Sequence, residues 1–404
     1  MIYGAEFPDH AAACDTPHKV DIRSLDTLIA DHLGTHVPNA DVDRDDPCWF
    51  FFTSGTTGRP KAAVLTHGQM AFVCLNHLND LMPGTTPEDR SLVVAPLSHG
   101  AGVHQLVQLA AGVPTILLPD GPFDPATVWR LVAEHRVTNM FTVPTIVKML
   151  IEHPSVTQHD HSSLRYVIYA GAPMYRADQK KALAALGPVL VQYFGLGEVT
   201  GNITVLPPHE HSTDDTMRIG TCGYERTGMH VQIQDDTGAE VAPGATGEIC
   251  VTGPAVFAGY YNNPDANAKA FRNGWFRTGD LGHMDADGYV YITGRESDMY
   301  ISGGSNVYPR EIEEKLLLLD GIAEAAVLGV PDPKWGETGL AVCVPEPGST
   351  PDPDALCAQL KGQISSYKLP THFVFLDEMP KSGYGKITKK LIRETLAAQG
   401  LLPT

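Results

Sequence analysis

Residues 49–61 read Trp-Phe-Phe-Phe-Thr-Ser-Gly-Thr-Thr-Gly-Arg-Pro-Lys, an apolar run followed by a loop of small residues that ends in Lys61. Small residues let backbone N–H groups approach an anion closely, hydroxyl groups add donors, and Lys61 adds a positive charge. The spacing differs from the Walker loop, which requires Gly-x-x-x-x-Gly-Lys-Ser/Thr. An ordinary Gly/Thr turn is the alternative, but nine consecutive residues of this kind favour a loop that binds phosphate.

The same stretch opens an alternation of strands and helices that extends to about residue 195. Short apolar runs mark the expected strands at residues 49–52, 92–95, 115–118, 140–143, 166–170 and 189–193. A helix is expected after Asp124, because an aspartate N-cap followed by proline in the first turn is a common helix start. The alternation predicts an α/β fold with mostly parallel sheets covered by helices.

The pattern changes twice towards the C-terminus. Glycine, aspartate and threonine punctuate short β-like runs in residues 217–295, which predicts a small β-rich subdomain. A compact α+β unit is expected to follow, with helices at residues 309–319, 352–363 and 388–397 and strands at residues 323–330, 340–344 and 372–376. We therefore predict a large N-terminal domain of residues 1–296 and a small, mobile C-terminal domain of residues 297–404.

The composition limits the class of partner and the compartment. The 404 residues carry a formal net charge of −18, which argues against a nucleic-acid binder because the phosphate backbone favours basic surfaces. The net charge does not exclude a small phosphate-bearing ligand, because a few local hydrogen-bond donors are sufficient to bind one. The seven cysteines lack CxxC spacing, as in a reducing compartment. No apolar run approaches the roughly 20 residues of a membrane span, and no signal peptide is evident, so a cytoplasmic protein is expected.

Residues 53–61 resemble the phosphate-loop signature of the adenylate-forming superfamily, which comprises acyl-CoA synthetases, luciferases and non-ribosomal adenylation domains. Similar signatures follow in the family's order over residues 48–395. The resemblance implies that the loop holds ATP and that Thr53 also takes part in catalysis. The ATP-binding residues that it implies here are Thr53, Ser54, Gly55, Thr56, Thr57, Gly58 and Lys61.

Residues 193–198, Tyr-Phe-Gly-Leu-Gly-Glu, resemble the family's aromatic-Gly-x-Thr-Glu motif. The resemblance places Phe194 beside adenine, with Tyr193 and Gly195 in the same nucleotide site. It gives Glu198 the metal, and Mg²⁺ does prefer hard carboxylate oxygens and bridges phosphates.

Position 197 departs from that motif, because the family usually has threonine or serine where this chain has Gly197. A dinucleotide-binding glycine loop is the alternative, and Thr200 breaks its G-x-G-x-x-G spacing. Just after an expected strand, Gly171, Ala172 and Pro173 resemble the family's adenine-binding turn.

Residues 275–280, Trp-Phe-Arg-Thr-Gly-Asp, resemble the ribose-binding motif. A carboxylate accepts hydrogen bonds from both ribose hydroxyls, and the resemblance gives that role to Asp280. It implies that Arg295 contacts the nucleotide and that Ser297 is the hinge, where permissive backbone torsions matter more than the side chain. The loop that completes the CoA site is implied at Ser302, Gly303 and Gly304.

The remaining motifs concern the acid. Residues 380–386 resemble the catalytic-lysine motif, and Lys386 is expected to neutralise charge as the carboxylate attacks, whereas Lys381 is expected to be a solvated surface charge. Residues 96–102 resemble the segment that lines the acyl tunnel, which gives His99 a catalytic place between the carboxylate and the tunnel. Other histidines lack regular ligand spacing and are expected at the surface, namely His153, His159, His161, His209 and His211.

The resemblance implies an AMP-forming acyl-CoA synthetase that uses ATP, Mg²⁺ and CoA. The acid, fatty or aryl, becomes acyl-AMP and then a thioester. Two alternatives stay open, namely a ligase that loads a carrier protein and a non-catalytic nucleotide-binding remnant. The second alternative arises because only 52 residues precede the loop, where the family usually has over a hundred. Apolar surface exposed by a shorter N-terminal region would favour association, so a homodimer stays open as well.

Overall fold

The structure is a computed structural model that describes residues 1–53, 60–172, 174–295, 297–381 and 387–403. It divides into two compact units, residues 1–43 and residues 44–404. The first unit contains β1 (Ile2–Tyr3), α1 (Pro8–Ala13), β2 (Val20–Asp21) and α2 (Leu25–Asp31), and β1 pairs parallel with β2. Within the described ranges, no helix is long and apolar enough to cross a membrane.

The second unit opens with the hairpin that flanks the phosphate loop. Strand β3 (Pro47–Thr53) pairs antiparallel with β4 (Lys61–Thr66), and Thr53 lies opposite Lys61. The strand expected at residues 49–52 is confirmed, but its expected place in the parallel sheet is wrong. Only residues 54–60 join the two strands, and so short a link allows a hairpin but not a parallel crossover, which needs a dozen residues or more.

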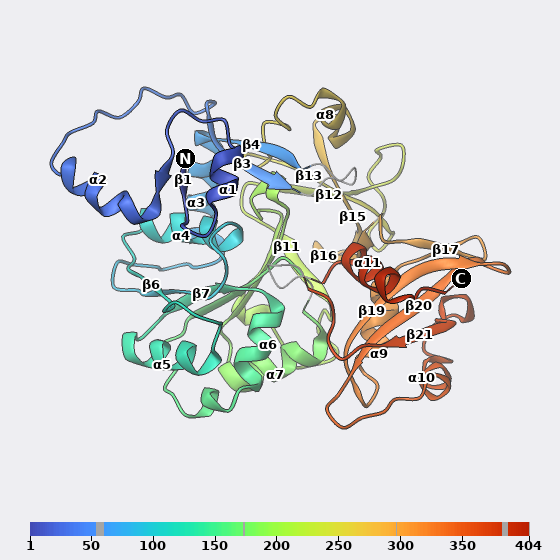
Figure 1. Cartoon of the computed structure of the whole chain (residues 1–404). Helices are drawn as coiled ribbons and strands as arrows, with labels where there is room; N and C mark the ends of the chain where they lie inside the picture. The colour runs from blue at the N-terminus through green and yellow to red at the C-terminus, as the bar shows by residue number, and fades with distance from the viewer. Residues whose placement is uncertain (54–59, 173, 296, 382–386, 404) are drawn as a thin grey trace. The chain divides into compact units, whose positions relative to one another are not determined.

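Parallel strands form the first half of the large sheet (Figure 1). They run in the order β6 (Thr115–Leu117), β5 (Ser91–Val93), β7 (Asn139–Thr142), β8 (Tyr166–Tyr169) and β9 (Leu190–Phe194). These strands match the sequence prediction to within one or two residues at each end. Apart from the edge strand β6, these apolar runs are largely buried on both faces, as expected for a parallel sheet covered by helices.

Helices cover both faces of this parallel half. One face packs against α5 (Pro125–His135), α6 (Pro144–Glu152) and α7 (Arg176–Leu186), and the other against α3 (His67–Asp80) and α4 (Gly100–Ala110). The expected start of α5 is confirmed, since the Asp124 carboxylate accepts from the backbone N–H groups of Ala126 and Thr127.

Antiparallel strands continue the same sheet beyond β9. Strand β10 (Thr204–Leu206) joins the two halves, and the sheet then runs through β11 (Thr221–Glu225), β16 (Tyr289–Arg295), β15 (Trp275–Met284), β13 (Gly247–Thr252) and β12 (His230–Gln234). Helix α8 (Pro264–Ala270) and β14 (Phe271–Arg272) precede β15. The β-rich character expected for residues 217–295 is confirmed, but the strands extend the parallel sheet rather than forming a separate one.

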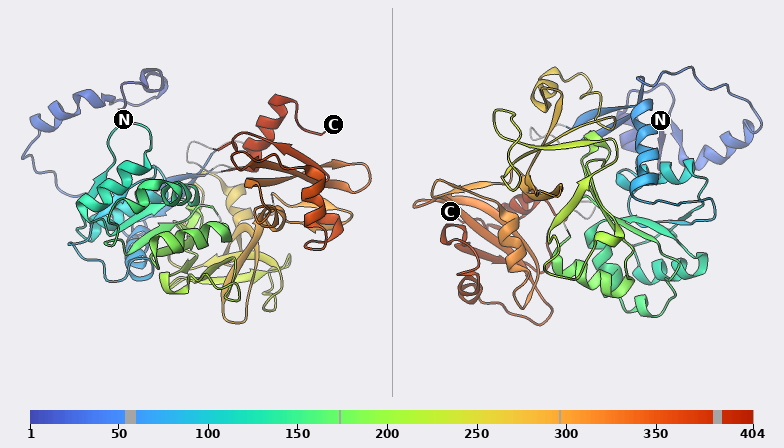
Figure 2. Two further views of the ribbon diagram at one scale, coloured as in Figure 1. Left: turned by 90° about the horizontal axis from the view of Figure 1, so that it is seen from below. Right: turned by 180° about the vertical axis from the view of Figure 1, so that it is seen from behind.

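The C-terminal residues form a separate sheet with its own helices. The sheet contains β17 (Tyr300–Ser302), β18 (Ser305–Val307), β19 (Ile322–Asp332), β20 (Gly336–Pro345) and β21 (His372–Phe375). Helices α9 (Pro309–Leu316) and α10 (Pro353–Leu360) cover one face of this sheet, and α11 (Lys389–Gln399) covers the other (Figures 1 and 2). Alternate side chains of β19 pack against these two groups of helices. The α+β order agrees with the prediction, and the domain boundary at residues 296–297 stays a prediction.

A substitution at Gly223 on β11 tests how tightly the two halves of the large sheet pack together. Its φ is +92°, and a Cβ atom there would overlap the carbonyl of Val205 on β10. We expect Gly223→Ala to lower the free energy of unfolding by about 3 kcal/mol or more, because strain and overpacking each cost about 1–3 kcal/mol. Denaturant unfolding followed by circular dichroism measures this. Gly348→Ala, where φ is +82° and nothing lies within 4 Å, should lose less, and an equal loss would contradict the account.

Candidate active site

The buried carboxylate of Glu198 is the centre of the site. It lies on the 3-10 helix η3 (Gly197–Val199), directly after β9, and is 5% exposed. Its Oε1 accepts a 3.1 Å hydrogen bond from the Thr53 hydroxyl and a 2.8 Å hydrogen bond from the Tyr260 hydroxyl. Tyr260 was not predicted, because no motif spacing marks it. Burial raises the pKa of Tyr260 far above its ordinary value, so this hydroxyl keeps its proton and donates.

The second oxygen of Glu198 fits a magnesium ion. No side chain or backbone group in the described ranges donates to Oε2, which leaves a hard oxygen free beside the phosphate loop. The described residues contain no group of three or more His, Cys, Asp or Glu that could hold a metal by themselves. Mg²⁺ commonly binds one or two carboxylates and takes its other ligands from phosphates and water, so one carboxylate is sufficient here.

Lys61 brings a positive charge to the same place. Its ammonium lies 4.2 Å from the centre of the Tyr260 ring, and Thr53 faces it across the hairpin. Thr53 therefore contacts the Glu198 carboxylate directly, and Lys61 lies next to it by way of the Tyr260 ring. Five predicted ATP-binding residues of the loop lie outside the described residues and stay predictions, namely Ser54, Gly55, Thr56, Thr57 and Gly58.

The structure explains why glycine replaces the usual hydroxyl residue at position 197. A Cβ atom on Gly197 would lie 2.5 Å from the Phe51 ring and 3.1 Å from the methyl group of Thr53. A serine or threonine would therefore push β3 away from η3. The close approach brings Thr53 within hydrogen-bonding distance of Glu198, so the departure from the family motif has a steric reason.

The predicted adenine-binding residues divide between two faces of the sheet. Successive side chains of a strand point to opposite faces, so Tyr193 and Phe194 do not face the same ligand. Phe194 packs against the apolar cluster that includes β4, whereas Tyr193 belongs to the cluster beneath α3 and α4. In the predicted adenine turn Gly171 has a positive φ of +82°, Ala172 follows it, and Pro173 lies outside the described residues.

Asp280 and Arg295 form a cross-strand pair on β15 and β16. Arg295 Nε donates to Asp280 Oδ1 at 3.0 Å, and Asp280 is 4% exposed. Its other oxygen, Oδ2, is buried and has no partner among the described residues, which is what an acceptor of ribose hydroxyls requires. Burial raises the pKa of Asp280, the Arg295 guanidinium opposes that rise, and the carboxylates of Asp298 and Glu198 add to it. Glu198 and Asp280 are therefore electrostatically coupled.

The C-terminal lysines differ from expectation in one respect. Lys386 lies outside the described residues and stays the predicted catalytic lysine. Lys381, expected to be a solvated charge, is half-buried and forms a 2.9 Å ion pair with Glu324 on β19, so that expectation is wrong. Lys389 is half-buried in a close ion pair with Glu313, and desolvation lowers the pKa of Lys389 to about 8.

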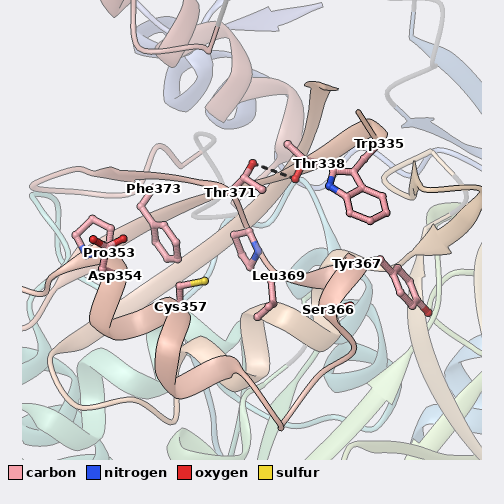
Figure 3. A pocket seen from close by; sticks show the side chains of 11 residues that line it. Trp335, Thr338, Pro353, Asp354, Cys357, Ser366, Tyr367, Leu369, Thr371 and Phe373 are labelled. Atoms are coloured by element: carbon pink, nitrogen blue, oxygen red, sulfur yellow. Dashed lines mark hydrogen bonds between the residues drawn. The ribbon is translucent and has the colours of Figure 1, made fainter. Parts of the chain in front are cut away.

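The predicted CoA loop is the tight turn between β17 and β18. Ser302 is buried, and Gly303 and Gly304 have positive φ angles of +58° and +80°. Gly303 N–H donates to the carbonyl of Trp335 at 2.8 Å, and a Cβ atom on Gly303 would lie 2.8 Å from the Trp335 ring. Trp335 also lines a cavity of about 440 Å³ between β20, α10 and the segment before β21 (Figure 3). The predicted hinge residue Ser297 donates to Asp298 Oδ1 at 3.4 Å.

The histidines separate into one site residue and several structural ones. His99 precedes α4. Its Nδ1–H donates to the carbonyl of Ser98 at 2.8 Å, and its ring centre lies 5.6 Å from that of Phe51. His211 was expected at the surface, and that expectation is wrong because it is buried against Tyr169 with its Nε2 3.1 Å from the hydroxyl. Burial lowers the pKa of His211 to about 4. The remaining four are exposed or half-buried, namely His153, His159, His161 and His209.

Comparison with known proteins assigns this chain to a class of enzyme. The family model of the AMP-binding enzyme matches residues 5–261, and that of the AMP-binding enzyme C-terminal domain matches residues 311–386. The chain therefore belongs to the AMP-binding enzyme family. This confirms the resemblance to adenylate-forming acyl-CoA synthetases and the α/β fold expected from it.

Individual relatives with similar sequences or structures define the class of enzyme more narrowly. A feruloyl-CoA synthase from Amycolatopsis sp is 40% identical over 358 residues, which cover 88% of this chain and 71% of the relative. An indoleacetate–CoA ligase from Aromatoleum aromaticum is 37% identical, covering 91% of this chain and 71% of the relative. The crystal structure of ATP-bound MatB from Rhodopseudomonas palustris matches with a TM-score of 0.83 at 35% identity, covering 92% and 72%. The prediction of an AMP-forming acid–thiol ligase is confirmed as a class.

Asp280→Asn should increase stability while weakening nucleotide binding. A carboxyl group whose pKa is raised by folding loses stability as the pH rises through that range, whereas asparagine stays neutral. We therefore expect a higher thermal unfolding midpoint at pH 7, a gain that shrinks as the pH falls, and weaker binding of MgATP. Asp320→Asn, an exposed position, should change neither quantity. A lower midpoint with unchanged MgATP affinity would contradict the assignment.

Proposed function

We propose that this chain activates a carboxylic acid with ATP, forming acyl-AMP and pyrophosphate, and then transfers the acyl group to the thiol of CoA. The acid is fatty or aryl. The observation that carries the proposal is the Glu198 carboxylate, which receives donors from both the start of the phosphate loop and Tyr260, with the Lys61 ammonium beside it. The relatives named above act on carboxylic acids and CoA by their names, which supports the same chemistry here.

The first step requires positioning and charge neutralisation more than covalent chemistry from the protein. A carboxylate oxygen attacks the α-phosphorus of ATP, and the bond to the bridging oxygen of pyrophosphate breaks. Glu198 and phosphate oxygens would hold Mg²⁺, which supplies charge neutralisation on the triphosphate. Thr53 and Lys61 lie beside that carboxylate, and Asp280 offers its unpartnered oxygen to the ribose.

The second step transfers the acyl group from AMP to sulfur. The thiol of CoA attacks the acyl carbonyl carbon, and AMP leaves with its phosphate oxygen. Support for CoA comes from the Ser302–Gly304 turn, where the absence of side chains at two successive residues leaves the Trp335 ring in contact with the backbone. The adjoining 440 Å³ cavity would accept an amphipathic group, since aromatic and proline side chains line it together with the Asp354 carboxylate (Figure 3).

Transfer to a carrier protein is not favoured. The chain passes directly from Arg295 through Asp298 into β17, without the insertion near the hinge that the acyl-AMP ligases of the family tend to carry. The relatives described above are named for CoA, which agrees with the shorter connection.

A pyrophosphate-release assay with a panel of fatty and aryl acids, with and without CoA, tests the proposal. We expect acid-dependent pyrophosphate with ATP and Mg²⁺, and an acyl-CoA product when CoA is added. Acyl-AMP that reacts with carrier protein but not with CoA would contradict the acceptor. Absence of pyrophosphate with every acid, from a folded chain, would contradict the function.

Lys386→Ala separates the two half-reactions. By resemblance Lys386 neutralises charge during adenylate formation, and loss of one such contact typically costs about 10²–10³ in rate. We expect a loss of that size in pyrophosphate release, while thioester formation from supplied acyl-AMP remains. Lys381→Ala is the control, because Lys381 pairs with Glu324 and should leave adenylate formation within about threefold of the parent chain. Equal loss of both half-reactions in Lys386→Ala would contradict the assigned role.

A further inference from the structure

The side chain of Tyr260 contacts two opposite charges of the site at once. Its hydroxyl donates to Glu198 Oε1 at 2.8 Å, and the Lys61 ammonium lies over its ring, 4.2 Å from the ring centre. A hydrogen bond at the hydroxyl and a cation over the ring face use different parts of one side chain, so both contacts can exist together. Tyr260 therefore stands next to the carboxylate and the ammonium without neutralising either.

Lys61 and Glu198 form no ion pair with each other in the part of the chain that the structure describes. The ammonium contacts the Tyr260 ring, and Glu198 Oε1 accepts from two hydroxyl groups instead. An aromatic face attracts a cation through its quadrupole and leaves the charge of that cation uncompensated. A direct ion pair would occupy the ammonium and the carboxylate oxygen that a metal-bound triphosphate needs.

The backbone around Tyr260 is bound to strand β4. Tyr261 N–H donates to the carbonyl of Ala62 at 2.8 Å. The side chain of Asn267 binds Tyr260 from another direction, since its Oδ1 accepts from Tyr260 N–H at 2.6 Å and its Nδ2 donates to the Tyr260 carbonyl at 3.1 Å. The segment is therefore fixed to the same strand that begins at Lys61.

Aromatic side chains hold the Tyr260 ring in place. The ring centre of Phe257 lies 4.8 Å from that of Tyr260 in an edge-to-face arrangement. Phe257 in turn stacks on Phe271 at 5.3 Å and meets the Phe276 ring edge-on at 5.2 Å. Tyr260 is 7% exposed, so turning its ring away from Glu198 would break buried aromatic contacts. The ring is therefore a fixed body between the two charges.

We propose that Tyr260 is a positioning residue that acts as a spacer, whose ring keeps Lys61 and Glu198 close together but unpaired. Both charges then stay available for the magnesium-bound triphosphate. This inference rests on the proposed function. Without the ring, the attraction between opposite charges would draw the lysine onto the carboxylate. That ion pair would compete with ATP for Lys61 and with Mg²⁺ for Glu198.

Two substitutions separate the ring of Tyr260 from its hydroxyl. Tyr260→Phe keeps the ring over which Lys61 lies and removes one of the two donors to Glu198 Oε1. Tyr260→Leu removes both the ring and the hydroxyl, so it alone should allow the ion pair to form. Tyr261→Leu is the matched control, because Tyr261 is the next residue, is 58% exposed, and has its ring centre 5.1 Å from that of Phe50.

A double-mutant cycle in the full chain, without any ligand, detects the ion pair directly. Lys61→Met and Glu198→Gln are made singly and together in the parent chain, in Tyr260→Phe and in Tyr260→Leu, and denaturant unfolding gives the coupling between them. We expect the coupling in the unfolding equilibrium constant to be about threefold to tenfold larger in Tyr260→Leu, the size of one ion pair. Tyr260→Phe should show the coupling of the parent chain. A general packing defect would lower stability without coupling the two charges.

Nucleotide binding measures the consequence of that ion pair. In isothermal titration with MgATP, Tyr260→Leu should bind about threefold to tenfold more weakly than the parent chain, while Tyr260→Phe and Tyr261→Leu stay within about threefold. Thermal unfolding reports whether each variant folds, and Tyr260→Met takes the place of Tyr260→Leu if the latter does not.

Two results would overturn the spacer and leave the proposed function intact. They are a coupling between Lys61 and Glu198 that is as large in the parent chain as in Tyr260→Leu, and equal weakening of MgATP binding by Tyr260→Phe and Tyr260→Leu. A folded parent chain that releases no pyrophosphate with any acid of the panel would instead overturn the proposed function. The coupling needs no ligand, so it would still decide whether the ring separates the two charges.

Discussion

The structure depends on one hydrogen-bonded carboxylate. Glu198 Oε1 accepts from Thr53 at the end of β3 and from Tyr260 in the loop before α8, so three segments that are distant in sequence meet at one oxygen. A buried carboxylate is costly unless its lone pairs are satisfied. The two hydroxyl donors offset that cost at Oε1, and no donor to Oε2 lies in the part of the chain that the structure describes, which suits a cation there. The same contact holds Thr53, at the end of β3, beside the segment that carries the aromatic motif.

Several other features of the site follow from close backbone approach. Gly197 lets β3 pack against η3, and Gly100 lets α4 pack against two rings. The Asp280 carboxylate has only one of its two oxygens hydrogen-bonded within the described ranges. Oδ1 accepts from Arg295, and Oδ2 has no partner there. Incomplete satisfaction of a buried group lowers stability, and such groups are common where a ligand completes the hydrogen bonds. Without a ligand, the unpartnered oxygen of Asp280 therefore lowers the free energy of unfolding of the chain.

Much of the fold could be predicted because its signals are local. The apolar runs of β5, β7, β8 and β9 and the Asp124 cap of α5 lie within short stretches of sequence. The pairing of β3 with β4 was missed because an apolar run looks alike in either kind of sheet. Tyr260 could not be predicted, since its partner Glu198 lies 62 residues away and no motif spacing marks it. The predictions that His211 and Lys381 lie exposed at the surface were wrong, because tertiary packing between distant segments decides which side chains are buried.

The central claim is that Glu198 and the strands around it bind the triphosphate of ATP with magnesium. Isothermal titration of MgATP into the intact chain, alongside Glu198→Gln and the exposed control Glu134→Gln, tests it most directly. The account predicts binding by the parent chain and by Glu134→Gln, and a loss of the magnesium-dependent part of the affinity in Glu198→Gln. A folded parent chain that does not bind MgATP, or a Glu198→Gln variant that binds it equally well, would contradict the account.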